Sequence, residues 1–540
     1  MKTLYYNGDF VPMTGEGDTF EALLVADDGT IAAVGDYAEL KERMDGAQEV
    51  DLKGATVCPG FIDPHSHFSG TTQYLTTVDL SFCESFEDIK QTMLRFMEER
   101  HVDSDGVIMG TGYDQNALVE GRHPDKSLLD QVSLDIPVVA MHASSHMAVA
   151  NSKMLELAGI TKDTPDPEGG HYGRSEDTGE LTGYAEEPAA LFPLFGIVQP
   201  RLKMDLPAMF PEMQRFYLEQ GVTTCQDGAT QEDFAQLFAH MAKAGQIKLD
   251  VVAYPMYGRD VKGMLDQGAE FVGQDYVGHY RIGGVKMFVD GSPQGRTAWM
   301  TEPYTPGEDG KEDYCGFGTM TDEEALDFAL FALDGNYQLL CHCNGDAAAD
   351  QYLRIYREAL TKTSNPDAGK LRPVMIHCQC TRTDQYEAMA EINMIPSIFV
   401  SHVWYWGDVH IRNFGPERGS RISAARDALD NGLPFTFHSD TPVLKPNALE
   451  SIWCAVNRVT KKGRQLDESQ KVSAYEALRA VTANGAYQYG EEERKGTLEP
   501  GKLADLVILD KNPCKVDPMD IRDIKVLETV KEGESVYRRR

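Results

Sequence analysis

The sequence lacks a long apolar segment, an excess of basic residues and a cysteine framework. No stretch approaches the about 18 apolar residues of a membrane helix, and the first residues have no apolar core of a signal peptide. The formal net charge of −34 argues against nucleic acid and anionic membrane surfaces as partners, because both bind basic faces. The ten cysteines include no Cys-x-x-Cys pair, as is typical of a reduced protein. These absences predict a cytoplasmic protein that binds neither nucleic acid nor a membrane.

Both ends of the chain consist of short strand-like runs. Over the whole chain, 42% of the residues are hydrophobic, which is enough for a large core. Residues 22–26 and 30–35 are such runs, and residues 505–510 near the C-terminus have the same character. Asn7-Gly8 and Asp28-Gly29 predict hairpins between runs of this kind. We therefore expect the two ends to form one small β-domain.

Between these ends the chain alternates strands with capped helices. Thr321-x-x-Glu324 is a capping box that opens a helix, Gly335 closes that helix, and Ser473-x-x-Glu476 opens another. Strand, capped helix and strand in succession form the pattern of a parallel sheet. Eight strands can be placed, near Phe61, Val222, Val251, Val285, Leu340, Met375, Ile398 and Phe435.

Residues 70–210 interrupt this pattern. They contain a helix capped by Ser85, several strand-like pieces, and a stretch rich in glycine and proline at 164–183. We interpret them as an insertion after the first strand that covers the active site as a lid or substrate subdomain. The predicted domains are therefore a β-domain of residues 1–56 plus 495–540, a barrel domain of residues 57–494, and the insertion of residues 70–210 within it.

The strongest local motif is PGFIDPHSH at residues 59–67, an apolar strand that ends in His-x-His. Residues i and i+2 of a strand face the same way, so His65 and His67 can bind one metal ion through imidazole nitrogens. Surface or core histidines would explain a bare His-x-His pair as well, and it is the preceding run that favours a metal site.

Lys286 lies inside an apolar strand, where a lysine costs free energy unless it is paired or modified. A neutral, buried amine can react with CO₂ to form N6-carboxylysine, a carbamate that can bridge two cations. The alternative is an ammonium group that reaches solvent or pairs with an aspartate such as Asp290.

His342 and His377 each end a further apolar strand, the position at which a barrel places its catalytic groups. If these histidines point inward, strand alternation turns the adjacent side chains outward. We therefore interpret the cysteines near both histidines as small buried hydrophobic residues and not as metal ligands: Cys341, Cys343, Cys378 and Cys380.

Asp440 ends the last strand, where a carboxylate can bind a metal ion and accept a proton from water. His438 faces the same way, and we interpret it as a support for the ligands. Four histidines, one lysine and one aspartate thus mark the ends of strands one, four, five, six and eight. Such nitrogen and oxygen donors suit two divalent cations, with Zn²⁺ as the first choice.

Over essentially its whole length the chain resembles the amidohydrolase superfamily, and within it the N-substituted formamide deformylase-like branch (the amidohydrolase 3 group). The motifs that carry the resemblance are residues 59–67, 286–292 (KMFVDGS), 342–346 (HCNGD), 376–379 (IHCQ), 439–442 (SDTP) and 496–507 (GTLEPGKLADLV). The chain departs from the branch at Phe68, at the cysteines beside the later histidines, and at Tyr113, where tryptophan is common. These departures spare the ligands and concern the substrate.

The resemblance implies an α/β fold, namely a distorted (β/α)8 TIM barrel with a β-sandwich made from both termini. It also implies a homodimer, and a proton transfer by Asp440 from the attacking water to the leaving amine. It assigns six metal ligands: His65, His67 and Asp440 for one ion, His342 and His377 for the other, and carboxylated Lys286 as the bridge.

Three further residues are suggested as substrate-binding by the same resemblance. Residues 112–116 resemble a substrate-side loop that contains Tyr113, and residues 145–152 place His146 near the site. Arg296, ten residues after Lys286, could contact an anionic group of the substrate. Helix packing and a surface ion pair are equal alternatives for His146 and Arg296.

These expectations lead to a hydrolase that cleaves a C–N bond in a small amide, formamide or cyclic amide. A metal-bound hydroxide would attack the carbonyl carbon, with Asp440 as the proton shuttle. A deaminase, or a lyase or decarboxylase with one metal ion and unmodified Lys286, is the first alternative, because barrels of this kind host several chemistries. A metal- or ligand-binding protein without turnover is the second.

Overall fold

The computed structural model describes residues 2–540 except 44, 45, 47, 116, 143–145, 203 and 307–311. Contacts within the chain divide it into two compact units. The first unit consists of Met1–Ser69 and Phe210–Arg540, and the second of Gly70–Met209. The first unit therefore combines both ends of the chain with its second half.

Nine parallel strands of the first unit form two sheets, ordered β16-β15-β14-β7 and β17-β18-β19-β20-β21. All eight strands predicted from the sequence are confirmed, and β16 is an additional one. Nearly all of their residues are buried, as is typical of parallel strands covered on both faces. The strands are β7 (Phe61–Ile62), β14 (Val222–Thr230), β15 (Asp250–Pro255), β16 (Tyr280–Ile282), β17 (Gly284–Phe288), β18 (Gln338–Cys343), β19 (Val374–His377), β20 (Ile395–Ile398) and β21 (Thr436–Phe437).

The regular pairing thus divides the parallel strands between two sheets, whereas the predicted barrel is one closed sheet. A single parallel bridge between Met256, which directly follows β15, and Lys286 of β17 connects the first sheet to the second. At the opposite edges, the backbone N–H of Asp440 donates to the carbonyl of His65 (3.1 Å). Both points of approach involve residues predicted to bind metal.

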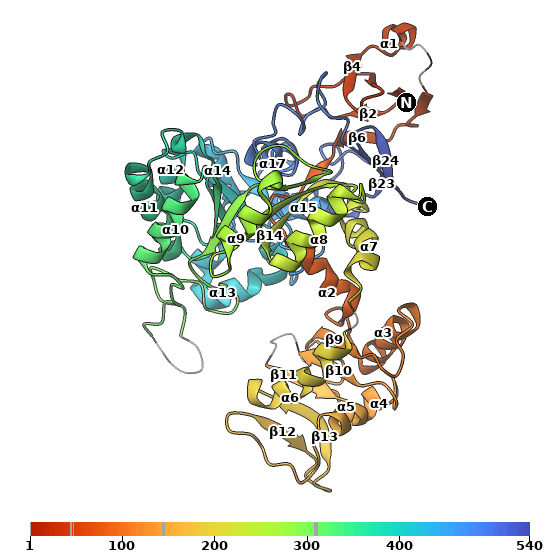
Figure 1. Cartoon of the computed structure of the whole chain (residues 1–540), viewed down its shortest axis with the longest axis vertical. Coiled ribbons are helices and arrows are strands. Elements are labelled where there is room, and N and C mark those ends of the chain that lie inside the picture. Colours follow the sequence, from red (N-terminus) through yellow and green to blue (C-terminus); the bar gives the residue numbers. More distant parts are fainter. Residues whose placement is uncertain are drawn as a thin grey trace. The chain divides into compact units, whose positions relative to one another are not determined.

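Helices connect successive strands, and α10, α11 and α12 lie next to one another (Figure 1). The predicted capping boxes at Thr321 and Ser473 are both confirmed, as is the end of α10 at Gly335. In the described part of the chain no helix is long and apolar enough to cross a membrane. The helices are α7 (Leu206–Leu218), α8 (Glu232–Lys243), α9 (Val261–Gln267), α10 (Asp322–Asp334), α11 (Asp346–Lys362), α12 (Thr383–Ala390), α13 (His402–Ser420), α14 (Ala425–Asp430), α15 (Ala448–Asn457), α16 (Ala474–Ala480) and α17 (Ala483–Gln488).

The chain ends form two further sheets in the first unit. The sheet β4-β3-β1-β5 comes from the N-terminal segment alone, whereas β2-β6-β22-β23-β24 pairs N-terminal with C-terminal strands, red beside blue in Figure 1. Phe10, Leu23 and Leu506 belong to one apolar core that both sheets share. The strands are β1 (Thr3–Tyr6), β2 (Asp9–Phe10), β3 (Ala22–Val25), β4 (Ile31–Gly35), β5 (Gln48–Asp51), β6 (Thr56–Pro59), β22 (Leu506–Leu509), β23 (Val526–Lys531) and β24 (Glu534–Arg538), with α1 (Tyr37–Arg43) after β4.

One predicted hairpin is confirmed and the other is wrong. β3 and β4 pair antiparallel around Asp28-Gly29, as predicted. The strands on either side of Asn7-Gly8 do not pair with each other, because β1 pairs with β5 and β2 with β6, both in parallel. The turn carries the chain from one sheet into the other, and the Asn7 side chain donates to Asp51 at 2.7 Å. The local motif specifies the turn, but burial of the apolar faces chooses the partner strand.

The second unit is a six-stranded sheet, ordered β12-β13-β11-β10-β9-β8, with helices packed on it. Ser85 caps α3, as predicted. Val138 and Val139 of β10 belong to two different apolar clusters, since successive side chains of a strand point to opposite faces. The elements are β8 (Val78–Asp79), β9 (Ile108–Tyr113), β10 (Val138–His142), β11 (Met147–Ala150), β12 (His171–Arg174) and β13 (Leu181–Glu186), with α2 (Thr71–Thr76), α3 (Phe86–Glu99), α4 (Lys126–Asp130), α5 (Ser152–Leu157) and α6 (Pro188–Val198).

A buried network of opposite charges joins β15 and β16 to the C-terminal segment. Oδ2 of Asp250 lies 2.5 Å from Nζ of Lys495 and 2.8 Å from Nζ of Lys531. Three cations face three anions among its buried members, and Lys531 also lies 3.1 Å from Oε1 of the partly exposed Glu532. The buried members, none more than 3% exposed, are Asp250, Arg281, Glu491, Lys495, Asp505 and Lys531.

Candidate metal centre

The six predicted ligand side chains form one cluster, which lies at the carboxyl ends of the parallel strands. Nε2 of His65 and Nε2 of His67 each lie 3.4 Å from Oδ1 of Asp440. Nζ of Lys286 lies 3.0 Å from Nε2 of His65. The ring centre of His377 is 5.6 Å from that of His65 and 4.5 Å from that of His342, which completes the group.

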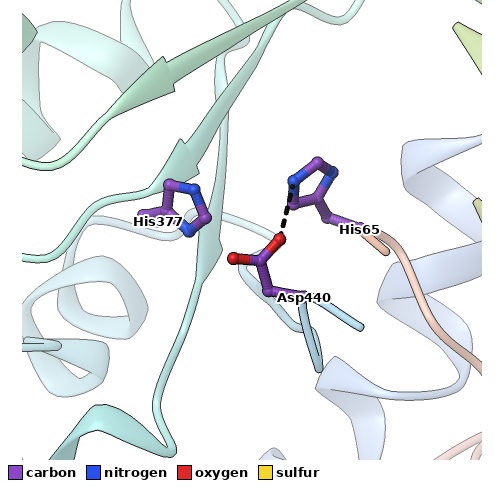
Figure 2. Close-up of side chains that lie close together, drawn as sticks. All are labelled: His65, His377 and Asp440. Carbon is purple, nitrogen blue, oxygen red and sulfur yellow. Dashed lines mark ion pairs between the residues drawn. The ribbon is translucent and has the colours of Figure 1, made fainter. Parts of the chain in front are cut away.

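Three of these residues already have the spacing of a metal site. Their ligand atoms, one each from His65, His377 and Asp440, lie within 4.8 Å of one another. Figure 2 shows the three side chains facing one another, with the ion pair between His65 and Asp440 dashed. Two imidazoles and a carboxylate are donors that Zn²⁺ and similar divalent ions accept.

The backbone at two strand ends of the cluster adopts left-handed conformations. His377, Cys378 and Asp440 have φ values of 80°, 47° and 53°. A non-glycine residue in this region costs on the order of 1–3 kcal/mol, which the surrounding packing has to offset. Strain of this kind is typical of functional sites, and here it falls on two predicted ligands.

Gln226, in β14, orients the His65 ring by contacting its Nδ1, the nitrogen that faces away from the cluster. Nδ1 of His65 lies 2.6 Å from Oε1 of Gln226, an oxygen that can only accept, so the ring hydrogen is on Nδ1. The amide nitrogen of Gln226 donates to the carbonyl of Pro64 at 2.8 Å, which keeps the oxygen turned toward the ring. Nε2 of His65 therefore presents its lone pair to the cluster.

Asp290 is the corresponding partner of His342. Oδ1 of Asp290 lies 3.2 Å from Nδ1 of His342, and the carboxylate also accepts from the backbone N–H groups of Asn344 and Gly345. Nε2 of His342 lies 3.2 Å from the side-chain nitrogen of Asn344, so binding a metal ion there requires that contact to open.

His438 contacts the His377 ring on the side away from the cluster. Its Nε2 lies 3.2 Å from Nδ1 of His377, and its own Nδ1 lies 2.9 Å from Oγ of Ser397. The interpretation of His438 as a support for a ligand agrees with this arrangement. The imidazoles of His65, His342 and His377 thus each have a partner on the nitrogen away from the cluster, an arrangement that commonly orients histidine ligands of metals.

Burial shifts the protonation of the cluster toward the forms that bind metal. Lys286 is fully buried, its Nζ lies 4.7 Å from the ring centre of Phe288, and burial lowers its pKa to about 8. Among the described residues no carboxylate forms an ion pair with Lys286, and it has no solvent-exposed surface. Burial, followed by the charge of Lys286, lowers the pKa of His65 to about 3, and burial also holds the pKa of His377 well below its ordinary value.

The cysteines beside the later histidines are placed largely as predicted. Cys341, Cys343 and Cys378 are buried, and Cys380 is partly buried. Burial raises the pKa of the Cys378 thiol, which disfavours the thiolate that would bind a metal. No cysteine belongs to a group of potential ligands within the described ranges of the chain.

Tyr113 and His146 lie in the second unit. Tyr113 is buried in an apolar cluster, and its hydroxyl lies 3.0 Å from Nδ1 of His123. His146 is exposed, and its Nδ1 lies 3.0 Å from Oε2 of Glu187. Of the motifs that suggested these residues, Asn116 and Ser145 lie outside the described residues.

Arg296 lies in the first unit, on the loop after β17. Its φ is 60°, its guanidinium donates to the carbonyl of Thr305 at 2.7 Å, and it lies 5.3 Å from the ring centre of Tyr304. These contacts place the side chain along its own loop. The substrate roles of Tyr113, His146 and Arg296 stay predictions.

Apart from His438, the hydrogen-bond partners that orient the predicted histidine ligands were not identified from the sequence. Gln226 lies within β14, and a polar residue in an otherwise buried strand was a signal that could have pointed to it. Asp290 was considered only as a partner of Lys286, whereas it contacts His342.

Solved structures agree with the class that this fold and cluster define, that of metal-dependent hydrolases. An uncharacterized metal-dependent hydrolase from Pyrococcus horikoshii OT3 is 25% identical, with a TM-score of 0.74 over 96% of this chain and 99% of that one. A similarly described protein from Pyrococcus furiosus is 26% identical, with a TM-score of 0.73 over 95% of this chain and 100% of that one.

Sequence comparison gives the family. Residues 48–537 match the model of the amidohydrolase family, so the chain belongs to this family, and the predicted resemblance is confirmed. The N-substituted formamide deformylase of Arthrobacter pascens is 29% identical over 96% of this chain and 95% of that protein. The chain is thus a metal-dependent hydrolase of the amidohydrolase family, whose members act on small molecules.

Proposed function

We propose that this enzyme hydrolyses a C–N bond in a small amide, formamide or cyclic amide at a centre of two divalent cations. The observation that carries the proposal is the convergence of six nitrogen and oxygen donors from five parallel strands on one buried cluster. The similarity to a formamide deformylase over nearly the whole chain supports the type of bond.

The donor set fits two cations, with Zn²⁺ as the first choice. The imidazoles of His65 and His377 are buried and neutral, their outer nitrogens have partners, and the carboxylate of Asp440 lies close to both. The proposed ligands are His65, His67 and Asp440 for one ion, His342 and His377 for the other, and Lys286 for both.

Lys286 takes part in this proposal as N6-carboxylysine. A primary amine reacts with CO₂ only in its neutral form, and a pKa of about 8 makes that form far more populated near neutral pH than in a free lysine. The new carboxylate would bring one negative charge into a cluster of neutral imidazoles, where cations can balance it.

Cations bound here would polarise the substrate carbonyl and bring the pKa of water toward neutrality. Asp440 accepts the proton of the attacking water and returns it to the leaving nitrogen. Burial favours the neutral acid, but His377 and His65 outweigh it and hold the pKa of Asp440 well below its ordinary value. The carboxylate is therefore ionised at neutral pH, as a base has to be.

We also propose that the two parallel sheets are the halves of one distorted (β/α)8 barrel. The Met256–Lys286 bridge and the hydrogen bond from Asp440 to His65 support this closure. The paired strands of both termini support a β-sandwich domain of residues 1–56 plus 495–540 beside a barrel domain of residues 57–494. The lid role of residues 70–210, a homodimer and a cytoplasmic location complete the proposal, and they rest on the sequence alone.

Three measurements on the Zn²⁺-loaded protein test the proposal together. We expect two metal ions per chain by elemental analysis, a carbamate carbon in the ¹³C spectrum after growth with ¹³C-bicarbonate, and turnover of at least one compound in a panel of amides, formamides and hydantoins. One ion and an unmodified lysine would contradict the binuclear centre. A metal-loaded protein that hydrolyses nothing in the panel would contradict the proposed bond type.

A further inference from the structure

A pair of buried histidines outside the ligand set lies beside the candidate metal centre. His402 begins α13, and His410 lies in the same helix. Their rings stack with centres 5.2 Å apart and an interplanar angle of 9°, and Nδ1 of His402 lies 3.0 Å from Nε2 of His410. His402 is 3% exposed and His410 is fully buried.

Both rings are neutral near pH 7. Burial lowers the pKa of His410 to about 3, and burial together with His410 holds the pKa of His402 well below its ordinary value. Of the two facing nitrogens, one therefore carries a hydrogen and the other accepts it. Only two arrangements satisfy this condition: either both rings carry their hydrogen on Nε2, or both carry it on Nδ1.

The far nitrogen of His410 distinguishes the two arrangements. Nδ1 of His410 is buried and has no hydrogen-bond partner among the described residues. A sealed N–H without an acceptor is rarer in proteins than an acceptor without a donor. The favoured arrangement leaves this nitrogen without hydrogen, so Nε2–H of His410 donates to His402, and His402 carries its own hydrogen on Nε2.

One aromatic ring lies close both to His402 and to the predicted ligand His377. Phe399, directly after β20, has its ring centre 4.7 Å from that of His402, 5.2 Å from that of His438 and 6.0 Å from that of His377. The hydrogen bond of His402 to His410 uses Nδ1, and Nε2 of His402 is not among the sealed side-chain atoms that lack a partner in the described part of the chain. In the favoured arrangement the hydrogen of His402 is on Nε2, the nitrogen that does not face His410.

We infer that His402 is a substrate-binding hydrogen-bond donor for an acceptor oxygen of the small-molecule substrate, and that His410 is the positioning residue that keeps it in the donating form. This inference rests on the proposed function for the identity of the bound molecule. A neutral donor would orient a carbonyl or carboxylate group without adding a cation to a site that is proposed to bind metal ions.

The ring hydrogens are read directly by nuclear magnetic resonance. In protein labelled with ¹⁵N-histidine, long-range ¹H–¹⁵N spectra distinguish Nε2–H from Nδ1–H, and His402→Gln and His410→Gln each remove one set of signals for assignment. We expect both rings to carry the hydrogen on Nε2. Hydrogens on Nδ1 would overturn the inference, and this reading does not depend on turnover of any amide.

Kinetics with the best amide of the panel test the contact with substrate. His402→Phe removes the donor, and we expect kcat/KM to fall about 100-fold with the metal content unchanged. His402→Gln, whose amide can donate, should stay within about tenfold of the wild type, and His410→Phe should lose about tenfold. The exposed His240→Gln is the matched control and should show no change.

The outcomes separate this inference from the proposed function. Wild-type activity in His402→Phe, or loss of metal from it, would overturn the substrate contact while leaving amide hydrolysis intact. A wild-type protein without amide turnover would contradict the proposed function, and the ring-hydrogen spectra would then decide the arrangement of the pair.

Discussion

Replacing Asp250 by asparagine should destabilise the first unit strongly, because this carboxylate faces two buried lysines. Its Oδ2 lies 2.5 Å from Nζ of Lys495 and 2.8 Å from Nζ of Lys531, and its Oδ1 lies 2.8 Å from Nδ1 of His279. Asparagine has nearly the same shape but no charge. The variant therefore removes one negative charge from the buried members of the network and leaves them with one more cation than anions.

The expected loss in the free energy of unfolding follows from the burial of the ion pairs that Asp250 forms with Lys495 and Lys531. Removing one partner of a buried ion pair costs about 3–5 kcal/mol. The first unit has about 400 residues. With about 2.1 cal/mol/K of unfolding entropy per residue, the unfolding entropy of the whole unit is about 0.8 kcal/mol/K. A loss of about 4 kcal/mol should therefore lower Tm by about 5 °C.

Tryptophan fluorescence measures this unit selectively, since all four tryptophans lie in it: Trp299, Trp404, Trp406 and Trp453. Asp275→Asn is the matched control, because Asp275 is fully exposed and should leave Tm unchanged. The double variant Asp250→Asn/Lys495→Met restores the charge balance and should recover part of the loss. An Asp250→Asn variant that melts within about 1 °C of the wild type would refute the argument that the network is sealed from water.

The pH dependence of this difference has a defined sign. Burial favours the neutral acid, but Lys495 and Lys531 hold the pKa of Asp250 well below its ordinary value. The stabilisation is therefore fully present above the unfolded-state pKa of about 4 and is lost as the pH falls through the lower folded-state value. The gap in Tm between wild type and Asp250→Asn should be constant from about pH 5 to 9 and shrink below about pH 4.

Four further predictions concern the candidate metal centre. Asp440→Asn should keep most of the bound metal in elemental analysis but lose about 1,000-fold or more in kcat, and full activity would exclude the proton transfer. Lys286→Ala should lose the carbamate signal and at least about 100-fold in kcat, and added acetate should restore part of the activity. Equal kcat values for the wild type and this variant would exclude carboxylated Lys286 as the bridge between the metal ions. Gln226→Leu should weaken metal binding about 10–100-fold in a chelator titration, with Gln226→Glu closer to the wild type, because the group that orients His65 is lost. Removing metal that was present at about 100 times its Kd should cost about 2.7 kcal/mol and lower the tryptophan-detected Tm by about 3 °C, whereas an unchanged Tm would mean that no metal stabilises this unit.

The elements and the six clustered side chains could be predicted because the signals for them are local. Capping boxes at Thr321 and Ser473 depend on residues three apart, and the pairing of His65 with His67 on one face depends on strand alternation. All eight predicted strands appear for the same reason, since apolar runs between capped helices can form little else. The Asn7-Gly8 hairpin failed because a turn motif does not specify which strand its neighbour pairs with.

The sequence by itself determined which residue types stand at the ends of the parallel strands, and hence that a metal centre could form. Only the tertiary structure decided what stands behind those residues: Gln226 is 161 positions from His65, and Asp290 is 52 positions from His342. The same holds for the contact between His402 and His410, whose proposed direction depends on a nitrogen left without a partner by packing. No local periodicity encodes such contacts, because they depend on which distant strands and helices enclose a side chain and on how completely they exclude water.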